Sequence, residues 1–387
     1  MNETIYMPVG EVCSSISDTY REKKNMVTLI NTSDVLEGRV LNHERVPNSN
    51  LKGQFKKTFQ RDDILYSEIR PQNRRFAYVD FSPIDYIAST KLMVIRAKKD
   101  VVSPKYLYYF LKNTSTVAEL QLLAETRSGT FPQITFSEVA NLTIPVPSLA
   151  VQEVIVQTMQ CLEDKITCNE QINDNLQQQA FSVFDNLIAN AENNDCTVSD
   201  YAFLNPKRTL TKNQVARSID MSQLSTSGAF PSGWEMKPFN GGMRFTNGDT
   251  LLARITPCLE NGKTAFIDFL DDGEVAFGST EYIVLAPKNG TPPEMLYCLA
   301  RYPAFVDYAV KNMNGSSGRQ RVSAETVGQY RLPLFDKHSL VLFKEVVSPM
   351  FLKMRYNSLE NIRLSELRDA LLPKLMSGEI DVSAVQL

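Results

Sequence analysis

The chain contains the same sequence unit twice, and the second copy follows about 188 residues after the first. One copy is SGTFPQITFSEVANLTIP at positions 128–145, and the other is SGRQRVSAETVGQYRLP at positions 317–333. The copies match without a gap over twelve residues, from Ile134 and Val322 to Pro145 and Pro333. A duplication of this length predicts two similar modules related by a pseudo-twofold axis.

Two further pairs of blocks extend the duplication toward the start of each copy. RDDILYSEIRP matches NGDTLLARITP, so that Asp63 and Pro71 correspond to Asp249 and Pro257 at an offset of 186. SPKYLYYFL likewise matches PPEMLYCLA at an offset of 189. The order of the blocks is kept, and small changes of offset are what loop insertions in a tandem duplication produce.

Each copy combines a strand-rich stretch with a long helical stretch. Residues 1–148 contain short apolar runs such as MVTLI, DILYSEI and RFAYVDF, and the turn residues between them are typical of short strands. Residues 149–193 contain no glycine or proline and have a helical pattern, and the same succession recurs at 194–335 and 336–387. We therefore predict an α+β protein with two strand-rich domains, each followed by a helical spacer.

The helical stretches have the apolar periodicity of a coiled coil. Antiparallel packing of the two would place Asn169 opposite Asn361 and Asn173 opposite Asn357, and buried amide pairs of this kind fix helix register. A wet gap that tolerates the asparagines is the alternative interpretation. The periodic positions of the first stretch are Ile155, Met159, Leu162, Ile166, Asn169, Asn173, Leu176, Ala180, Val183 and Leu187; those of the second are Phe343, Val347, Met350, Met354, Asn357, Asn361, Leu364, Arg368, Leu371 and Leu375.

Two antiparallel helices of about 40 residues would form a rod of roughly 60 Å that holds the strand-rich domains at opposite ends. Two residues depart from the apolar pattern of the second helix. Arg368 interrupts its seam, and Pro349 has no proline counterpart in the first helix. We expect Pro349 to kink the second helix or to delay its start.

Composition and length narrow the class of protein. The chain has 387 residues, 43% of them hydrophobic and 22% charged, which is ordinary for a globular protein with two or three cores. No run reaches the roughly 18 apolar residues that span a membrane, so we expect a cytoplasmic protein without a membrane partner. The six cysteines form no CxxC pair and only two histidines are present, which argues against a zinc site.

Sequence motifs for catalysis and for cofactor binding are missing. Gly262, Lys263 and Thr264 are similar to the end of a phosphate-binding loop, but Pro257 stands where that loop requires glycine. The surrounding residues instead predict a turn between strands. Fingerprints of the GxGxxG, HExxH and NPPY types are also lacking. We therefore expect a subunit with no cofactor, no metal and no catalytic residues of its own.

The motifs that carry a family resemblance lie at the ends of the helical stretches and in the paired loops. They are the C-terminal string LRDALLPKLMSGEIDVS, the segment PVPSLAVQEVI at the start of the first helix, and the SGT and SGR loops. Together with the two-copy layout they resemble the specificity subunit of type I restriction-modification enzymes over essentially the whole chain. The second helix departs from this pattern, because FDKHSLVLFKEV lacks the residues that stand at Pro147 and Gln152.

The resemblance implies two target-recognition domains in a non-catalytic subunit. In that family the subunit directs modification and restriction subunits to an asymmetric DNA sequence made of two separated parts. The implied partners are double-stranded DNA, two copies of the methyltransferase subunit and, through the complex, restriction subunits. Because the loops of the two copies diverge, we expect unlike half-sites, and a helical rod predicts an unread spacer of fixed length.

Base recognition requires Arg, Lys, Asn or Gln side chains that reach a groove, with phosphate contacts around them. Such residues cluster at matching places in both copies, past a predicted strand and in the paired loops, although the net charge is -3. For any single residue a solvated surface charge is the simpler interpretation, whereas the matched clusters favour DNA contact. The candidates are Lys56, Lys57, Arg61, Arg70, Gln72, Asn73, Arg74, Arg75, Arg127, Ser128 and Thr130 in the first copy and Arg254, Asn261, Lys263, Ser317, Arg319, Gln320 and Arg321 in the second.

Two other functions are compatible with parts of this pattern. A protein scaffold that joins two partner proteins would have the same duplicated frame and rod, but it would not explain basic loops at matching places. A single-chain methyltransferase with an unrecognised site would bind adenosylmethionine in isolation, and we expect no such binding.

Overall fold

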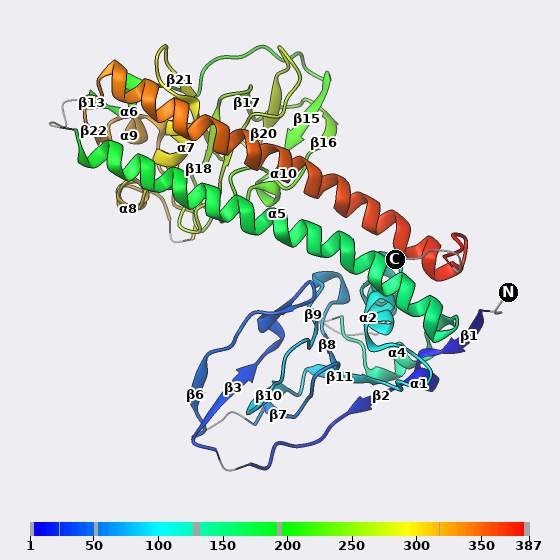
Figure 1. The fold of residues 1–387 in the computed structure, drawn as a ribbon. Coiled ribbons are helices and arrows are strands. Elements are labelled where there is room, and N and C mark those ends of the chain that lie inside the picture. Colours follow the sequence, from blue (N-terminus) through cyan, green and yellow to red (C-terminus); the bar gives the residue numbers. More distant parts are fainter. Residues whose placement is uncertain are drawn as a thin grey trace. The chain divides into compact units, whose positions relative to one another are not determined.

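The computed structural model describes residues 4–22, 24–49, 53–126, 132–191, 196–316 and 318–382. The chain forms two compact units: unit 1 comprises residues 1–163 and 365–387, and unit 2 comprises residues 164–364. Both combine short strands with helices, and the two longest helices, α5 (Leu149–Ala189) and α10 (Lys337–Ser377), contribute residues to each unit (Figure 1). Across the described ranges, we find no helix that has the length and apolar character needed to cross a membrane.

Among its described residues, unit 1 contains two four-stranded sheets. One has the order β2-β11-β8-β9 and is antiparallel, and the other has the order β6-β3-β10-β7, in which β3 and β10 are parallel. The short pairs β1-β12 and β4-β5 accompany them. The strands are β1 (Ile5–Pro8), β2 (Cys13–Ile16), β3 (Met26–Ile30), β4 (Val35–Leu36), β5 (Arg39–Val40), β6 (Arg45–Pro47), β7 (Phe55–Lys57), β8 (Ile64–Ser67), β9 (Phe76–Tyr78), β10 (Tyr86–Ser89), β11 (Leu92–Ala97) and β12 (Thr143–Val146).

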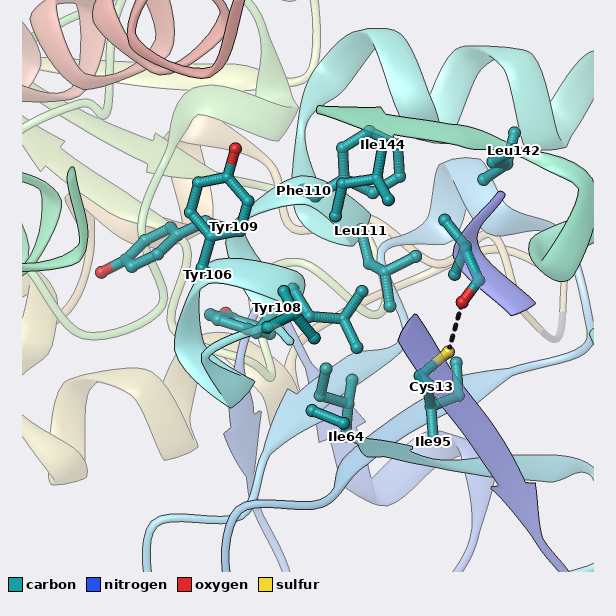
Figure 2. Close-up of a cluster of buried hydrophobic side chains, with 14 of the residues drawn as sticks. Cys13, Ile64, Ile95, Tyr106, Tyr108, Tyr109, Phe110, Leu111, Leu142 and Ile144 are labelled. Carbon is teal, nitrogen blue, oxygen red and sulfur yellow. Dashed lines mark hydrogen bonds between the residues drawn. The ribbon is translucent and has the colours of Figure 1, made fainter. Parts of the chain in front are cut away.

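One core of unit 1 lies between the β2-β11-β8-β9 sheet and its helices, and a second contains residues of both sheets. Helix α2 begins with Pro104 at its first position and Ser103 before it. Figure 2 shows Tyr106 and Leu111 of this helix in one buried cluster with Ile64 and Ile95 of the sheet. The helices of unit 1 other than α5 and α10 are α1 (Val9–Val12), α2 (Pro104–Lys112), α3 (Thr114–Thr126) and α4 (Phe136–Asn141), with 3-10 turns η1 (Thr32–Asp34) and η2 (Pro71–Asn73).

Two polar groups inside this core form hydrogen bonds with main-chain carbonyls. The Tyr106 hydroxyl donates to Pro145 O at 2.8 Å. The Cys13 thiol donates to Val9 O at 3.2 Å (Figure 2), and burial raises the pKa of Cys13 to about 12. Of the other thiols, Cys298 is buried whereas Cys161 and Cys168 are exposed on α5. In the part of the chain that the structure describes, no three His, Cys, Asp or Glu side chains are grouped so that they could hold a metal ion.

Unit 2 repeats the strand order of unit 1. Its sheets are β14-β21-β18-β19 and β16-β15-β20-β17, and β15 is parallel to β20 as β3 is to β10. The predicted α+β class with two similar strand-rich domains is therefore confirmed. The strands are β13 (Cys196–Thr197), β14 (Ala202–Leu204), β15 (Val215–Ile219), β16 (Glu235–Pro238), β17 (Met243–Phe245), β18 (Thr250–Ala253), β19 (Thr264–Phe266), β20 (Ala276–Gly278), β21 (Tyr282–Pro287) and β22 (Arg331–Leu332); the shorter helices are α6 (Val198–Tyr201), α7 (Pro293–Arg301), α8 (Pro303–Lys311) and α9 (Ala324–Gly328), with the 3-10 turn η3 (Met221–Gln223).

The start of the long helix differs between the units. In unit 1, Gln152 is fully buried and its Oε1 accepts the amide of Ser103 at 2.8 Å, while its Nε2 donates to Pro147 O at 2.8 Å. In unit 2, Pro292 stands before α7 where Ser103 stands before α2, and the buried residue at the place of Gln152 is Leu340. Proline has no amide hydrogen that would need an acceptor. The departure from the family pattern noted in FDKHSLVLFKEV thus has a physical cause.

Within unit 2, residues 164–189 of α5 pack antiparallel against residues 337–364 of α10, and asparagine pairs lie between them. Asn169 Nδ2 donates to Asn361 Oδ1 at 2.8 Å, and Asn357 Nδ2 donates to Asn173 Oδ1 at 2.8 Å. Asn169 and Asn357 are almost fully buried. These are the two pairings expected of antiparallel packing. Hydrogen-bonded amides in an otherwise apolar seam disfavour a sliding of one helix along the other.

Pro349 does not delay the second helix. Helix α10 begins at Lys337, before the proline, and is continuous through it to Ser377. That part of the prediction is wrong. The proline ring removes one helical hydrogen bond, but Val347 and Phe351 on either side of it are fully buried in the core of unit 2. Tertiary packing of this kind outweighs the local preference against proline.

Replacing Asn169 with leucine is expected to lower the free energy of unfolding by about 1 to 3 kcal/mol, because Asn361 Oδ1 then loses its buried donor. Chemical denaturation of the full chain measures this. Asn175→Leu is the matched control, since Asn175 is exposed on the same helix and a surface substitution there should stay within about 0.5 kcal/mol. Equal midpoints for the two variants would rule out a stabilising role for the buried pair.

Candidate nucleic-acid interface

In unit 1 the end of β8 is joined to the segment that precedes α4. Ile69, just beyond the strand, forms an antiparallel bridge with Gln133. Two main-chain hydrogen bonds flank the bridge: Ile134 N to Glu68 O at 2.9 Å and Arg70 N to Pro132 O at 3.1 Å. We call residues 68–70 with 132–134 the strand–loop junction of unit 1. It places the residues after the strand beside those after the loop, two regions that are far apart in the sequence.

Unit 2 contains the same junction, formed by residues 254–256 and 320–322. Ile255 bridges Arg321 in antiparallel fashion. The flanking bonds are Val322 N to Arg254 O at 3.0 Å and Thr256 N to Gln320 O at 3.1 Å. The two junctions therefore bring together, in each unit, the two regions in which the sequence predicted DNA-contacting residues. The duplicated blocks predicted the correspondence between copies, and the structure adds the contact within each copy.

The segment after β8 is shaped by its backbone. Arg70 and Arg74 have φ of +45° and +51° and flank the 3-10 turn η2. Arg70, Gln72 and Asn73 are exposed on this short segment. Left-handed conformations at residues other than glycine are uncommon and concentrate at functional sites.

The structure assigns local partners to three of the basic candidates of unit 1. Lys57 Nζ donates to Leu92 O at 2.8 Å, and burial lowers the pKa of Lys57. Arg75 Nη1 donates to Ser33 O at 2.9 Å. Arg74 Nη2 donates to Thr114 Oγ1 at 3.2 Å. Of these, Lys57 and Arg75 hold backbone carbonyls, which is a structural role.

The remaining candidates of unit 1 are exposed but do not all lie together. Lys56 is on β7, in the β6-β3-β10-β7 sheet, and Arg61 precedes the start of β8, at the opposite end of the strand from Arg70. The exposed residues beside the junction are Arg70, Gln72 and Asn73. Four candidates lie outside the described residues: Arg127, Ser128, Thr130 and Ser317.

In unit 2, Asn261 and Arg319 are the exposed candidates. Lys263 Nζ donates to Met221 O at 2.7 Å, at the turn between the antiparallel strands β18 and β19, so the turn expected at this place is confirmed. Gln320 is half-buried, and its main-chain N–H donates to Thr256 Oγ1 at 3.1 Å. Arg321 and Arg254 both turn toward Glu281, at 2.7 and 3.8 Å. The hydrogen bonds from Arg321 lower the pKa of Glu281.

Two buried ion pairs support the strands that carry the junctions. Asp63 and Asp249, at equivalent places before β8 and β18, are 0% and 1% exposed. Asp63 accepts two hydrogen bonds from Arg96 of β11 at 2.7 and 2.8 Å, whereas Asp249 accepts two from Arg208, which follows β14, at 2.6 Å each. Burial raises the pKa of Asp249 to about 6 in spite of Arg208, so its carboxyl group is ionised at neutral pH.

Sequence reasoning missed the residues that hold the junctions. It aligned Asp63 with Asp249 but assigned no role to either. It also passed over Lys91 and Glu281, although the strings ASTK and GSTE end at these two positions in the two copies. In both, the main-chain N–H of the charged residue donates to a serine hydroxyl: Lys91 N to Ser89 Oγ at 3.3 Å and Glu281 N to Ser279 Oγ at 3.1 Å. That short match was the available signal.

Comparison with known proteins gives a consistent result. Residues 6–178 match the model of the type I restriction modification DNA specificity domain. The chain is 29% identical over 437 aligned residues to the specificity subunit of the type I restriction enzyme HindI of Haemophilus influenzae, with 92% of this chain and 94% of that one covered. It is 23% identical to the MjaIX specificity subunit of Methanocaldococcus jannaschii, over 78% of this chain and 76% of that one.

A solved structure shares the fold. The S subunit of a type I restriction-modification system from M. genitalium has a TM-score of 0.54 at 16% identity, with 98% of this chain and 97% of that chain covered. The likeness thus extends from the sequence of the first domain to nearly the full length of the chain. Residues 6–178 therefore form a type I restriction modification DNA specificity domain, and the chain as a whole is similar to the specificity subunits of type I restriction enzymes.

Proposed function

We propose that the chain binds double-stranded DNA through both strand–loop junctions and directs partner subunits that carry out the chemistry. The observation that supports this most directly is the recurrence of the junction. In each unit, polar side chains able to contact bases stand exposed beside it: Arg70, Gln72 and Asn73 in one and Asn261 and Arg319 in the other. Amide and guanidinium groups are the donors that distinguish base pairs in the major groove. This chain would supply recognition and no catalytic group.

We further propose that the target is asymmetric and made of two parts. Equivalent places beside the two junctions carry different side chains. Arg70 in unit 1 and Thr256 in unit 2 are one example, since the main-chain N–H of each donates the same hydrogen bond of its junction. A different donor set selects a different base sequence. The recognition domains would be residues 1–148 and 194–335, with residues 149–193 and 336–387 as helical spacers that set the distance between the half-sites.

The partner surface that we propose is the outer face of the long helices, with two copies of a modification subunit as occupants and restriction subunits joining through them. Apolar side chains on α10 within unit 2 support this: Val341, Leu342, Val346, Leu352 and Tyr356 are between 43 and 57% exposed. A contiguous exposed apolar stripe on a helix is typical of a protein interface. Together with residues of α5, this end of α10 also lines a cavity of about 470 Å³. The assembled enzyme would act on DNA in the cytoplasm.

DNA binding is expected to weaken steeply with salt. If each complex neutralises six or more phosphates, affinity should fall by about 10³-fold or more between about 50 and 200 mM salt, because released counterions compete with the protein. A gel-shift assay of the full chain with its modification subunits, on genomic fragments, measures this. Methylation sequencing of a host with and without the gene then gives the motif and its asymmetry. A scaffold without DNA readout would produce no salt-dependent shift of the DNA, and the methylation pattern would be the same with and without the gene.

A further inference from the structure

Each strand–loop junction is held by a third segment, the one that contains the ASTK or GSTE string and its last, charged residue. In unit 1 the amide of Glu68 donates to Lys91 O at 3.0 Å, and in unit 2 the amide of Arg254 donates to Glu281 O at 3.0 Å. The backbone of Lys91 and that of Glu281 therefore occupy the same place in their units. Their side chains have opposite charge.

The partners of these two side chains are reversed to match. Lys91 Nζ lies 3.4 Å from Glu68 Oε2 and donates to Gln133 Oε1 at 3.2 Å. In unit 2 the places of Glu68 and Gln133 are taken by Arg254 and Arg321. Each unit thus has a side-chain lock made of three residues: Glu68, Lys91 and Gln133 in unit 1, and Arg254, Glu281 and Arg321 in unit 2.

The lock of unit 2 uses most of the donors of Arg321. Its Nε lies 3.0 and 2.9 Å from the two oxygens of Glu281, and its Nη2 donates to Glu281 Oε1 at 2.7 Å. Its Nη1 donates to Arg319 O at 3.1 Å. Arg321 therefore spans from the carboxylate to the backbone of Arg319, whose own side chain is exposed. Hydrogen bonds of this bidentate kind between ionised groups are strongly directional.

We propose that Glu281 and Arg321 are positioning residues, which hold the backbone of the 319–321 segment so that Arg319 contacts DNA. Lys91 and Gln133 hold residues 132–134 of unit 1 in the same way. This rests on the proposed DNA-binding function. Arg321 and Arg254, which were candidate DNA contacts from the sequence, are partners of Glu281 in this proposal. The guanidinium group of Arg321 is hydrogen-bonded to Glu281, and Nε of Arg254 lies 3.8 Å from the same carboxylate, so the base contact falls to Arg319. The two locks differ in every side chain but share one backbone arrangement. Their common effect is therefore the position that they give to the backbone of the junction.

The test compares three variants of the full chain, and the combination of Glu281→Gln with Arg319→Ala, each assembled with its modification subunits. The probes are a duplex carrying the motif found by methylation sequencing and a duplex of the same composition with the motif shuffled. Glu281→Gln breaks the charged lock. The triple variant Arg254→Glu, Glu281→Lys and Arg321→Gln installs the lock of unit 1 in unit 2. Arg319→Ala removes the proposed contact itself.

We expect Glu281→Gln to reduce the ratio of motif to shuffled affinity by about tenfold or more, while binding to the shuffled duplex strengthens and its salt slope steepens by about one as guanidinium charge becomes available to phosphates. The triple variant should recover most of the lost ratio. Arg319→Ala should lower the ratio in the parent but add little to Glu281→Gln. These combined outcomes distinguish a positioning role from mere support of the fold, which melting temperatures follow separately.

An unchanged ratio in Glu281→Gln would overturn the proposal. So would a triple variant that melts like the parent yet discriminates no better than Glu281→Gln, because Arg254 or Arg321 would then contact the bases directly. If Glu281→Gln fails to fold, the triple variant and Arg319→Ala still decide. A failure of the proposed function itself looks different, since the parent would then bind motif and shuffled duplexes alike.

Discussion

Replacing Arg70, Gln72 and Asn73 together with alanine is expected to reduce the affinity for the specific DNA target by about 100-fold or more, equivalent to about 3 kcal/mol. The three side chains are exposed beside the junction of unit 1 on the turn around η2. Each bidentate contact to a base edge contributes about 1 to 3 kcal/mol of discrimination, so the loss of more than one has a large effect. Binding titrations with the motif duplex and a shuffled duplex measure it.

The control for this variant is Arg21→Ala, which removes the same single positive charge from another exposed position of unit 1. It should change the affinity for both duplexes by little and equally. Melting temperatures of the two variants should lie close to that of the parent, because exposed side chains contribute little to stability. A triple variant that keeps the parent's preference for the motif would show that the readout of unit 1 lies elsewhere.

Asp249→Ala is expected to lower the free energy of unfolding by about 3 to 5 kcal/mol, because it leaves Arg208 without its partner at a site that is largely closed to water. It also removes the acceptor for Thr246 N, which lies 2.8 Å from Asp249 Oδ2. Urea denaturation at pH 7.5, where the carboxyl group is ionised, gives the difference from the parent. Asp63→Ala should have an effect of similar size in unit 1.

Asp271→Ala provides the matched control in the same unit. Asp271 forms an ion pair with Arg217 at 3.1 Å, but its side chain is 83% exposed. An exposed pair contributes about 0 to 1 kcal/mol, so this variant should remain near the parent. If Asp249→Ala and Asp271→Ala were equally mild, the buried pairs would not be the supports of strands β8 and β18 that their burial indicates.

The sequence was sufficient to predict those features that depend on a single segment or on the correspondence between the two copies. The seam periodicity located the long helices, and the offset between copies placed Asn169 opposite Asn361 and Asn173 opposite Asn357 in an antiparallel packing. Proline also acts locally, as Pro104 does at the first position of α2. Strand order in the sheets did not follow from any such rule, since it depends on contacts between distant segments.

The candidate DNA residues were harder to predict, because a basic side chain next to a turn serves equally well as a contact or as a support. Arg75 and Lys57 hold backbone carbonyls, and nothing in their sequence neighbours announces this. The arginine that pairs with the buried aspartate also comes from a different segment in each copy. Asp63 is paired by Arg96 on β11, but the corresponding position of β21 is Ala286, and Arg208 from another segment takes over. A comparison by position cannot detect such a replacement.

The differing starts of the two long helices have a consequence for recombination between specificity genes. Ser103 and Gln152 are joined by a hydrogen bond, whereas Pro292 and Leu340 stand at the equivalent places of unit 2. A chimera that grafts a strand-rich module with Ser103 onto a helix with leucine in place of Gln152 would bury an amide hydrogen without an acceptor, at a cost of about 1 to 3 kcal/mol. Crossover points that keep each of these pairs together avoid this defect. A transferred strand-rich module should therefore keep the first turns of its own long helix, so that no amide is left without its acceptor.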